Sequence, residues 1–264
     1  MTEASVAAAT EFSRHYRSPD GKWPQVIMEP SPPLPSTGCP VSITVRTTEG
    51  EVSRIIYHPY LAFIKFITEY WFDSVMDIGC GDGHEADIFN LFVPDVITIN
   101  HENTGYPATF QGDYLDFAAD YQVQAIWCSH VLEHVRNPGI FLDKIFADLA
   151  HGGVLCLTVP YHDFCSPPDV TILGHCNRFN VATLVYHLVM AGFDCRSLRY
   201  CVYSGQISIL LSKLRNDLPS GAAALGHEVY QFFPPGLSVG SAMQAFAARI
   251  NWDTPAEPSA AGIW

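Results

Sequence analysis

One glycine-rich loop in the first third of the chain constrains the fold most. The run Asp77-Ile78-Gly79-Cys80-Gly81-Asp82-Gly83 follows a short apolar strand and opens a predicted helix. Glycine at 79 and 81 allows a tight turn and lets a ligand contact bare backbone. The G-x-G-x-G spacing differs from the G-x-G-x-x-G of dinucleotide loops, and the missing Lys-Ser/Thr pair excludes a P-loop. The loop therefore predicts a binding site where a strand ends.

Strands and helices alternate after this loop. Short apolar runs at 74–78, 96–99, 125–128 and 154–159 predict strands, and helices are expected at 61–71, 85–92, 138–150 and after Asn180, which can cap the last of them. This order predicts an α/β, doubly wound, mostly parallel sheet with helices on both faces. The last two strands, near 195–202 and 206–211, are joined by about three residues, so they must be antiparallel.

The flanking segments read differently from this central part. Five prolines between residues 30 and 40 favour an extended arm or lid, and residues 42–57 alternate weakly, as in a short hairpin. The organisation we expect is an N-terminal arm over residues 1–57, a central domain over 58–213 and a C-terminal tail over 214–264. The tail, with its run Phe232-Phe233-Pro234-Pro235, is expected to pack on the domain or form a dimer contact.

Composition narrows the class of protein. Hydrophobic residues make up 48% of the 264 residues, enough for a core, and the formal net charge of -13 argues against electrostatic binding of nucleic acid or anionic membrane. No stretch approaches the ~20 apolar residues that span a bilayer, and the N-terminus does not read as a signal peptide. Eight cysteines without a CxxC pair favour buried free thiols and a cytoplasmic protein.

Four segments resemble known motifs in the right order. Residues 75–83 resemble motif I of class I S-adenosylmethionine-dependent methyltransferases. Residues 125–135 resemble the fourth-strand motif of the small-molecule, ubiquinone-biosynthesis type, and 149–155 the turn before strand five. Residues 174–193 resemble the substrate-side segment and sixth strand. The resemblance covers roughly 58–213 and implies a Rossmann-like, seven-stranded sheet whose last strand is antiparallel.

The resemblance implies how the glycine loop would bind S-adenosylmethionine. Gly79, Cys80 and Gly81 would line the methionine and ribose part of this cofactor. The carboxylate of Asp77 would organise the loop and receive the cofactor's amino group, directly or through water, since an ammonium near a carboxylate is favourable. The alternative for Asp77 is a carboxylate that only caps the loop.

The other expected cofactor residues follow later strands. The family places an acidic residue on the ribose hydroxyls, whereas this chain has Asn100 there, with Glu102 two residues on. Asp113 would meet the adenine amine or cap the turn that follows it. Ser129 and His130 fall at the end of strand four, beside the cofactor.

His130 and His134 raise the question of a metal ion. They are four residues apart, with Glu133 between them, a spacing that can hold a metal if the segment is helical. In the ubiquinone-type enzymes, a glutamate stands where His130 is, and a divalent ion has been associated with the site. The expectation favoured here is nevertheless no metal: His134 is a structural histidine, and His130 a wall of the cofactor pocket.

The acceptor side should come from residues 160–175. A hydroxyl acceptor usually needs a base, and histidine suits that role near neutral pH. His162 and His175 are the candidates, and the alternative for each is an ordinary loop histidine. The expected function is therefore methyl transfer to a small molecule, first of all the hydroxyl of a sugar or natural product, with transfer to nitrogen or carbon left open.

Two other functions remain to be weighed. A non-catalytic protein could keep the fold to bind the cofactor for a partner, or could have lost binding; Asn100 at the ribose position keeps this alternative open. A dinucleotide oxidoreductase is disfavoured by the glycine spacing and by the motif at 129–135.

Overall fold

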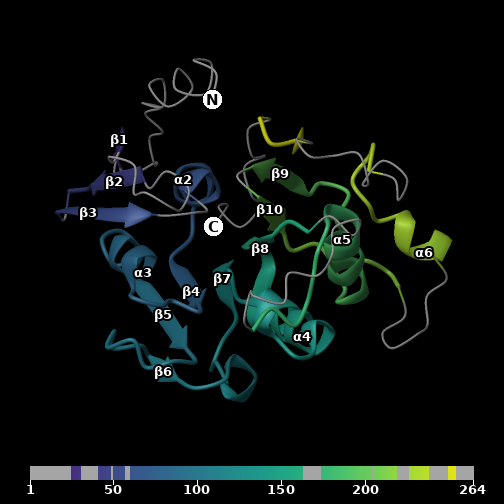
Figure 1. The fold of residues 1–264 in the computed structure, drawn as a ribbon, viewed down its shortest axis with the longest axis horizontal. Helices are drawn as coiled ribbons and strands as arrows, with labels where there is room; N and C mark the ends of the chain where they lie inside the picture. The colour runs from purple at the N-terminus through teal and green to yellow at the C-terminus, as the bar shows by residue number, and fades with distance from the viewer. Residues whose placement is uncertain are drawn as a thin grey trace.

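The computed structural model describes residues 25–30, 41–48, 50–56, 60–162, 174–203, 205–218, 226–237 and 249–253. Its largest feature is an eight-stranded sheet with the order β11-β9-β10-β8-β7-β4-β5-β6 (Figure 1). The parallel part comprises β4 (Ser74–Ile78), β5 (Asp95–Asn100), β6 (Phe110–Gln111), β7 (Val123–Ser129) and β8 (Leu149–Pro160). The remaining strands are β9 (Arg199–Tyr203), β10 (Gln206–Ser212) and β11 (Arg249–Ile250).

Helices cover both faces of this sheet (Figure 1). Helices α2 (Tyr60–Glu69) and α3 (His84–Phe89) bury Phe63, Phe66 and Phe89 against Trp127 of β7. The other face is covered by α4 (Pro138–Asp148) and α5 (Val181–Met190), whose apolar sides belong to one core cluster with the sheet. Burial of two apolar faces at once explains why the central strands read as continuous hydrophobic runs.

The predicted α/β fold is confirmed, with one strand more than expected. Strand β10 is antiparallel to both β8 and β9, as the short connection between β9 and β10 requires. The eighth strand is β11, whose two residues pair with β9 at the sheet edge. It was missed because two residues leave no period to detect.

A second, smaller sheet lies in the N-terminal part of the chain. Strands β2 (Val41–Arg46) and β3 (Glu51–Ile56) form the predicted hairpin, and β1 (Gln25–Pro30) adds a third antiparallel strand. Residues 1–40 were expected to form an extended arm or a partly ordered lid, but residues 25–30 are a strand; the rest of the stretch 1–40 lies outside the described residues. Arg54 of β3 donates to Asp87 of α3 at 2.5 Å, which ties the small sheet to the large one.

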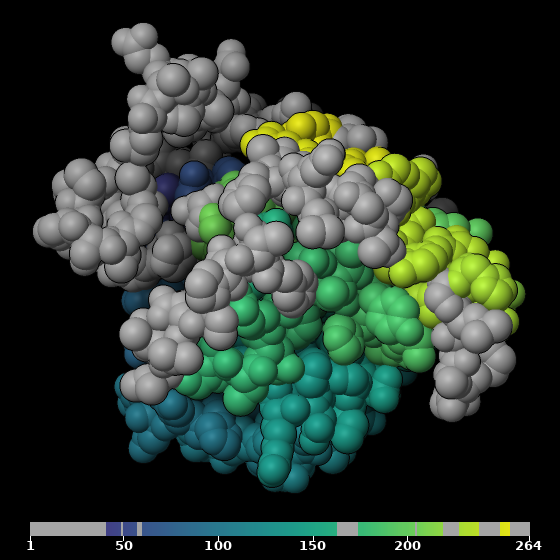
Figure 2. Space-filling view, turned by 45° about the vertical axis from the view of Figure 1, so that its right-hand side comes forward, coloured from purple at the N-terminus to yellow at the C-terminus, as the bar shows by residue number. Residues whose placement is uncertain are grey.

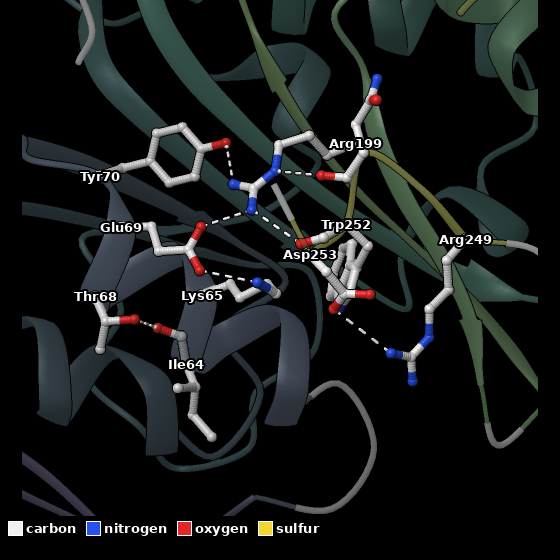
Figure 3. Close-up of polar contacts among 10 residues, drawn as sticks. Ile64, Lys65, Thr68, Glu69, Tyr70, Arg199, Arg249, Trp252 and Asp253 are labelled. Carbon is white, nitrogen blue, oxygen red and sulfur yellow. Dashed lines mark hydrogen bonds and ion pairs between the residues drawn. The ribbon is translucent and has the colours of Figure 1, made fainter. Parts of the chain in front are cut away.

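Segments near the C-terminus pack on the domain. Phe232 and Phe233, which follow α6 (Gly226–Tyr230), are buried in the same cluster as α5. In Figure 2 these yellow-green segments lie against the green surface of the central domain. Farther on, the buried Arg199 guanidinium donates to Glu69, Tyr70 and the Trp252 carbonyl, so it joins β9 to the end of α2 and to the turn after β11 (Figure 3).

The described cysteines match the expectation of buried free thiols. Six cysteines there are free thiols, and all of these except Cys176 are buried; Cys39 and Cys165 lie outside the described ranges. In those same ranges, every helix is too short or too polar to cross a membrane.

Candidate functional site

The polar residues singled out in the sequence gather at one edge of the large sheet. Parallel strands β4, β5, β7 and β8 all end there, and β10 begins there, because Gln206 pairs with Pro160 in antiparallel register. In doubly wound sheets, ligands bind outside the carboxyl ends of the strands. The sheet thus brings together residues from segments that are up to 130 positions apart.

Asp77 is the most buried acidic residue at this edge after Glu133. It lies on β4, with 1% of its surface exposed, and its Oδ2 has no hydrogen-bond partner among the described residues. Burial and the nearby carboxylate of Glu85 raise the pKa of Asp77 well above its ordinary value. A cation would relieve both costs, because it would supply the missing partner and offset the paired negative charges.

Glu85, in the first turn of α3, is the acidic neighbour that sequence reasoning missed. Burial raises its pKa to about 7, although its own backbone N–H and His130 act in the opposite direction. Its position two residues after Gly83 was the available signal, since a side chain there lies next to the loop. The edge therefore holds two carboxyl groups with raised pKa values, and a bound cation would favour their ionised forms.

The glycine loop divides into a structural part and an open part. The N–H groups of Gly79 and Cys80 both donate to the Ile99 carbonyl, at 2.8 and 3.1 Å, so they fix the loop to β5. The Cys80 side chain is buried, and burial with the charge of Asp77 raises its thiol pKa to about 12. Gly81 differs: at φ +52°, its missing Cβ would meet no heavy atom within 4 Å. Gly81 is therefore the position of this loop that can take ligand contact.

Asn100 supports the loop from the end of β5. Its Nδ2 donates to the Gly81 carbonyl and to Thr104 Oγ1, each at 3.2 Å, and Thr104 also donates to the Gly81 carbonyl at 2.6 Å. Both amide hydrogens are thus used inside the protein, which leaves the amide oxygen for a hydroxyl of a ligand. Glu102 lies exposed on the loop that follows.

Asp113 is the N-cap of the short 3-10 helix η1 (Tyr114–Asp116). Its Oδ1 accepts from the Leu115 N–H at 2.9 Å, which is the capping alternative weighed from the sequence. The second carboxylate oxygen faces an exposed environment, so capping and contact with an adenine amine are compatible.

The end of β7 positions Ser129 and His130. Ser129 shares a hydrogen bond with Thr158 of β8 at 2.9 Å. His130 takes a left-handed backbone conformation, with φ 55°, and its ring lies between two side chains: Nε2 is 2.9 Å from Gln206 Oε1, and Nδ1 is 3.2 Å from Glu133 Oε1. Burial lowers the pKa of His130, but Glu133 and Gln206 outweigh burial and raise it.

Gln206, at the start of β10, is a second residue that the sequence did not single out. It is 3% exposed, and its Nε2 has no hydrogen-bond partner among the described residues. Its partnership with His130 spans 76 positions, and no motif marks such a contact.

Glu133, His134 and His175 form the second cluster at this edge. One donor atom from each lies within 4.8 Å of the others, a set that could hold a metal ion. Glu133, in the 3-10 helix η2 (Leu132–His134), has no exposed surface. His130 Nδ1 lies 3.2 Å from its Oε1, and Oε2 has no hydrogen-bond partner among the described residues. A partly buried His134 that holds the strand-four loop was expected, whereas His134 is exposed and its Nδ1 lies 3.0 Å from the carbonyl of Gly174, in the segment before α5.

The structure also brings the two base candidates together. The rings of His162 and His175 are 6.1 Å apart, and those of His134 and His175 are 4.8 Å apart. Burial lowers the pKa of His162, helped by Arg178 and His175; burial, and then His134 and His130, lower that of His175 against the effect of Glu133. Burial therefore favours the uncharged form of both imidazoles, the form that a base needs. Asp163, expected beside His162, lies outside the described residues.

Comparison with known proteins gives one family. A family model described as "Methyltransferase domain" matches residues 23–198. A protein of Mycolicibacterium smegmatis named "Probable S-adenosylmethionine-dependent methyltransferase" is 29% identical over 133 residues, 46% of this chain and 52% of that protein. The chain thus spans about half the length of this curated relative.

Solved structures add two distant similarities. The N-methyltransferase NodS from Bradyrhizobium japonicum, in complex with S-adenosyl-L-homocysteine, is 14% identical with a TM-score of 0.45, covering 57% of this chain and 83% of that one. A SAM-dependent methyltransferase from Archaeoglobus fulgidus is also 14% identical with a TM-score of 0.45, covering 58% and 90%.

Proposed function

Because this chain belongs to the methyltransferase-domain family, we propose that it transfers the methyl group of S-adenosylmethionine to a small-molecule acceptor. The observation that carries the proposal is the buried Asp77, whose Oδ2 has no hydrogen-bond partner among the described residues, in the same loop as the open Gly81 and at the sheet edge that also holds His162 and His175. The first acceptor group to consider is a hydroxyl of a sugar or natural product.

The cofactor would lie over the glycine loop. Its ammonium group is the cation that Asp77 lacks, and its methionine part passes Gly81 and Cys80. The Asn100 amide oxygen accepts from one ribose hydroxyl, with Glu102 as the carboxylate nearest along the chain. Asp113 accepts from the adenine amine, while Ser129 and His130 border the sulfonium side.

The transfer itself needs little covalent help from the protein. When bound, S-adenosylmethionine would supply an electrophilic methyl group to an acceptor oxygen held in line with it, and S-adenosylhomocysteine would be the leaving group. The acceptor's proton passes to an uncharged imidazole, His162 or His175. General-base help of this kind contributes about 10²–10⁴-fold in rate.

The net charge of the chain and its buried free thiols bear on the acceptor class and on the cellular compartment. A net charge of -13 favours a neutral or cationic small acceptor over nucleic acid or anionic membrane. The buried free thiols suit a reducing compartment, so we place the protein in the cytoplasm. A homodimer remains part of the proposal, through the C-terminal segments.

Calorimetric titration with S-adenosylmethionine, S-adenosylhomocysteine and NAD tests the cofactor assignment. Micromolar binding of the first two without NAD supports it and justifies a screen of hydroxyl, amine and carbon acceptors with radiolabelled methyl donor. Absence of binding would overturn the enzyme proposal and favour the alternative of a scaffold that has lost the cofactor.

A further inference from the structure

We propose that a pocket at the edge of the large sheet opposite the glycine loop binds a small zwitterion of the free α-amino acid class. The pocket has a volume of about 380 Å³ and is lined by Arg196, Arg215, Asp217, Gln231 and Phe232. Small-molecule pockets typically measure roughly 300–1,000 Å³, so this one can enclose a ligand of that size.

The pocket is separate from the proposed methyl-transfer site. The end of β10 lies beside the start of β8, because the Lys213 N–H donates to the Gly153 carbonyl at 2.7 Å. Arg215 follows two residues later and forms an isolated bridge with Phe193. The carboxyl end of β8, at Pro160, pairs instead with the start of β10. A ligand in the pocket would therefore leave the cofactor edge free.

A buried asparagine fixes the two oppositely charged residues of the pocket. Asn216 is 6% exposed, and its Nδ2 donates to the carbonyls of Val189 and Phe193, at 2.7 and 2.9 Å. Because this side chain is directed inward, its neighbours Arg215 and Asp217 are exposed on the outside, where both line the pocket. The chain thus presents a cation and an anion two residues apart.

Arg196 is the second fixed cation of the pocket. Its Nε lies 3.0 Å from each carboxylate oxygen of the buried Asp194, and its Nη2 lies 2.5 Å from Oδ2. The guanidinium also lies 5.6 Å from the ring centre of the buried Phe232. These contacts use Nε and Nη2, so Nη1 remains available to a ligand.

Three side chains of the pocket have polar groups that a ligand could use. Arg215, Asp217 and Gln231 form no hydrogen bond or ion pair with any residue in the described ranges. A guanidinium presents a planar fork of donors that matches a carboxylate, and a carboxylate accepts hydrogen bonds from an ammonium group. The Gln231 amide can donate or accept.

The balance of charge indicates the class of ligand. Arg196 is already paired with Asp194, which leaves the cation of Arg215 and the anion of Asp217 without a counter-charge in contact. A phosphate dianion would be repelled by Asp217, and a simple amine by Arg215. A ligand with a carboxylate beside an ammonium group forms a charge-assisted hydrogen bond with each.

Calorimetric titration of the full chain, free of cofactor, with each of the standard L-α-amino acids tests the pocket. We expect at least one of them to bind with a Kd of about 1 mM or tighter. Its N-acetyl derivative lacks the ammonium group and its amide lacks the carboxylate, so each should bind at least about tenfold more weakly. Arg215→Met and Asp217→Asn should weaken binding of the amino acid by at least about tenfold too.

Two variants outside the pocket are the matched controls. Arg46→Met removes an exposed arginine of β2, and Asp143→Asn removes an exposed aspartate of α4. They change the net charge by the same amounts as the pocket variants, so they should leave the titration unchanged. Circular dichroism of each variant establishes that it is folded.

Several outcomes would overturn the proposal. They are no binding of any amino acid, binding that survives both pocket variants in folded protein, and competition by S-adenosylhomocysteine, which would place the amino acid at the glycine loop. Equally tight binding of the N-acetyl derivative or of inorganic phosphate would indicate a site for a peptide carboxyl terminus or a simple anion instead. Because the titration involves no methyl transfer, an inactive enzyme would leave its result unchanged.

Discussion

At the scale of single residues, Gly81 offers the sharpest test of the cofactor assignment. Its backbone is left-handed, and no protein atom lies within 4 Å of where a Cβ would be. Gly81→Ala places a methyl group in the space assigned to the cofactor. We expect affinity for S-adenosylmethionine to fall at least about tenfold, or ~1.4 kcal/mol, measured by calorimetry.

Gly152→Ala is the matched control for Gly81→Ala. Gly152 also has a left-handed backbone, with φ +75° and open space around its Cβ position, but it lies at the start of β8 rather than at its carboxyl end. Both substitutions carry about 1–2 kcal/mol of backbone strain, so both should lower the melting temperature similarly. Equal cofactor affinity in the two variants would remove Gly81 from the binding site.

The pair Asp77 and Glu85 predicts how cofactor binding depends on pH. Burial raises both pKa values, that of Glu85 to about 7, so the free protein retains protons that a cationic cofactor would displace. The ligand favours the deprotonated carboxyls, and affinity should therefore rise between pH 6 and pH 8. Calorimetry in buffers of different ionisation enthalpy should show proton release, and Glu85→Gln should reduce it. An affinity independent of pH would contradict this assignment.

The raised pKa of Glu85 also makes the stability of the folded state depend on pH. An acid whose pKa is raised on folding binds more protons in the folded state, so its stabilising contribution is complete below its unfolded pKa. For Glu85 that contribution is lost as pH rises from 4.5 to about 7.

At the residue scale, the sequence predicted which residues belong to the glycine loop, but not which residues contact one another. The motif identified Asp77 and Gly81, because loop chemistry depends on local spacing. The motif does not predict that Asn100 donates both amide hydrogens to the Gly81 carbonyl and Thr104, or that Glu85 lies near Asp77. Those contacts depend on how strands and helices pack. The cofactor roles of these residues stay predictions.

Among the elements, α5 has the clearest sequence signal and the clearest test. Asn180 accepts from the Thr183 N–H at 2.9 Å, and the Thr183 hydroxyl accepts from the Asn180 N–H at 3.0 Å, a complete capping box. Asn180→Ala should therefore cost about 1 kcal/mol of unfolding free energy. Asn137→Ala is the control, because Asn137 begins α4 without a side-chain cap bond. Urea unfolding that gave equal losses for both would contradict the capping role.

The strands were predictable from the sequence where burial on both faces produces a hydrophobic run. The strands β4, β5, β7 and β8 lie between two helix layers, so their hydrophobic runs are continuous and easily read. Strand β1 ends at Pro30 among other prolines, which predicted an arm, yet an edge strand tolerates proline. Strand β11 exists only through pairing with β9, a contact that local sequence does not encode.

At the scale of the whole molecule, the sequence predicted the sheet and therefore the edge where ligands bind. It did not predict which residues meet there across long separations. His134 and His175 are 41 positions apart, and their rings approach because backbone bonds from Cys176 and Asn177 to Glu133 bring two segments together. The spacing of His130 and His134 suggested the wrong pair for a shared face, since η2 is a 3-10 helix that ends at His134, and His130 precedes it.

One buried arginine ties distant parts of the chain together. Arg199, 6% exposed, donates to Glu69 at 2.6 Å, to Tyr70 at 3.0 Å, and to the Asn251 and Trp252 carbonyls (Figure 3). Arg199→Met keeps the apolar stem but leaves these acceptors unpaired. Removing one partner of a buried ion pair typically costs about 3–5 kcal/mol, and the lower end is expected here because Lys65 still neutralises Glu69.

Arg196→Met is the control for Arg199→Met, because it removes an arginine whose ion pair is exposed instead of buried. Arg196 pairs with Asp194 at 2.5 Å, but its side chain is 62% exposed, and exposed pairs contribute little to stability. Calorimetric unfolding should show a melting temperature lower by about 6–12 °C for Arg199→Met and nearly unchanged for Arg196→Met. Equal shifts would mean that β11 and α2 are held by other contacts. A large shift for Arg199 alone would mean that its contacts with the end of α2 and with the residues after β11 contribute to cooperative unfolding.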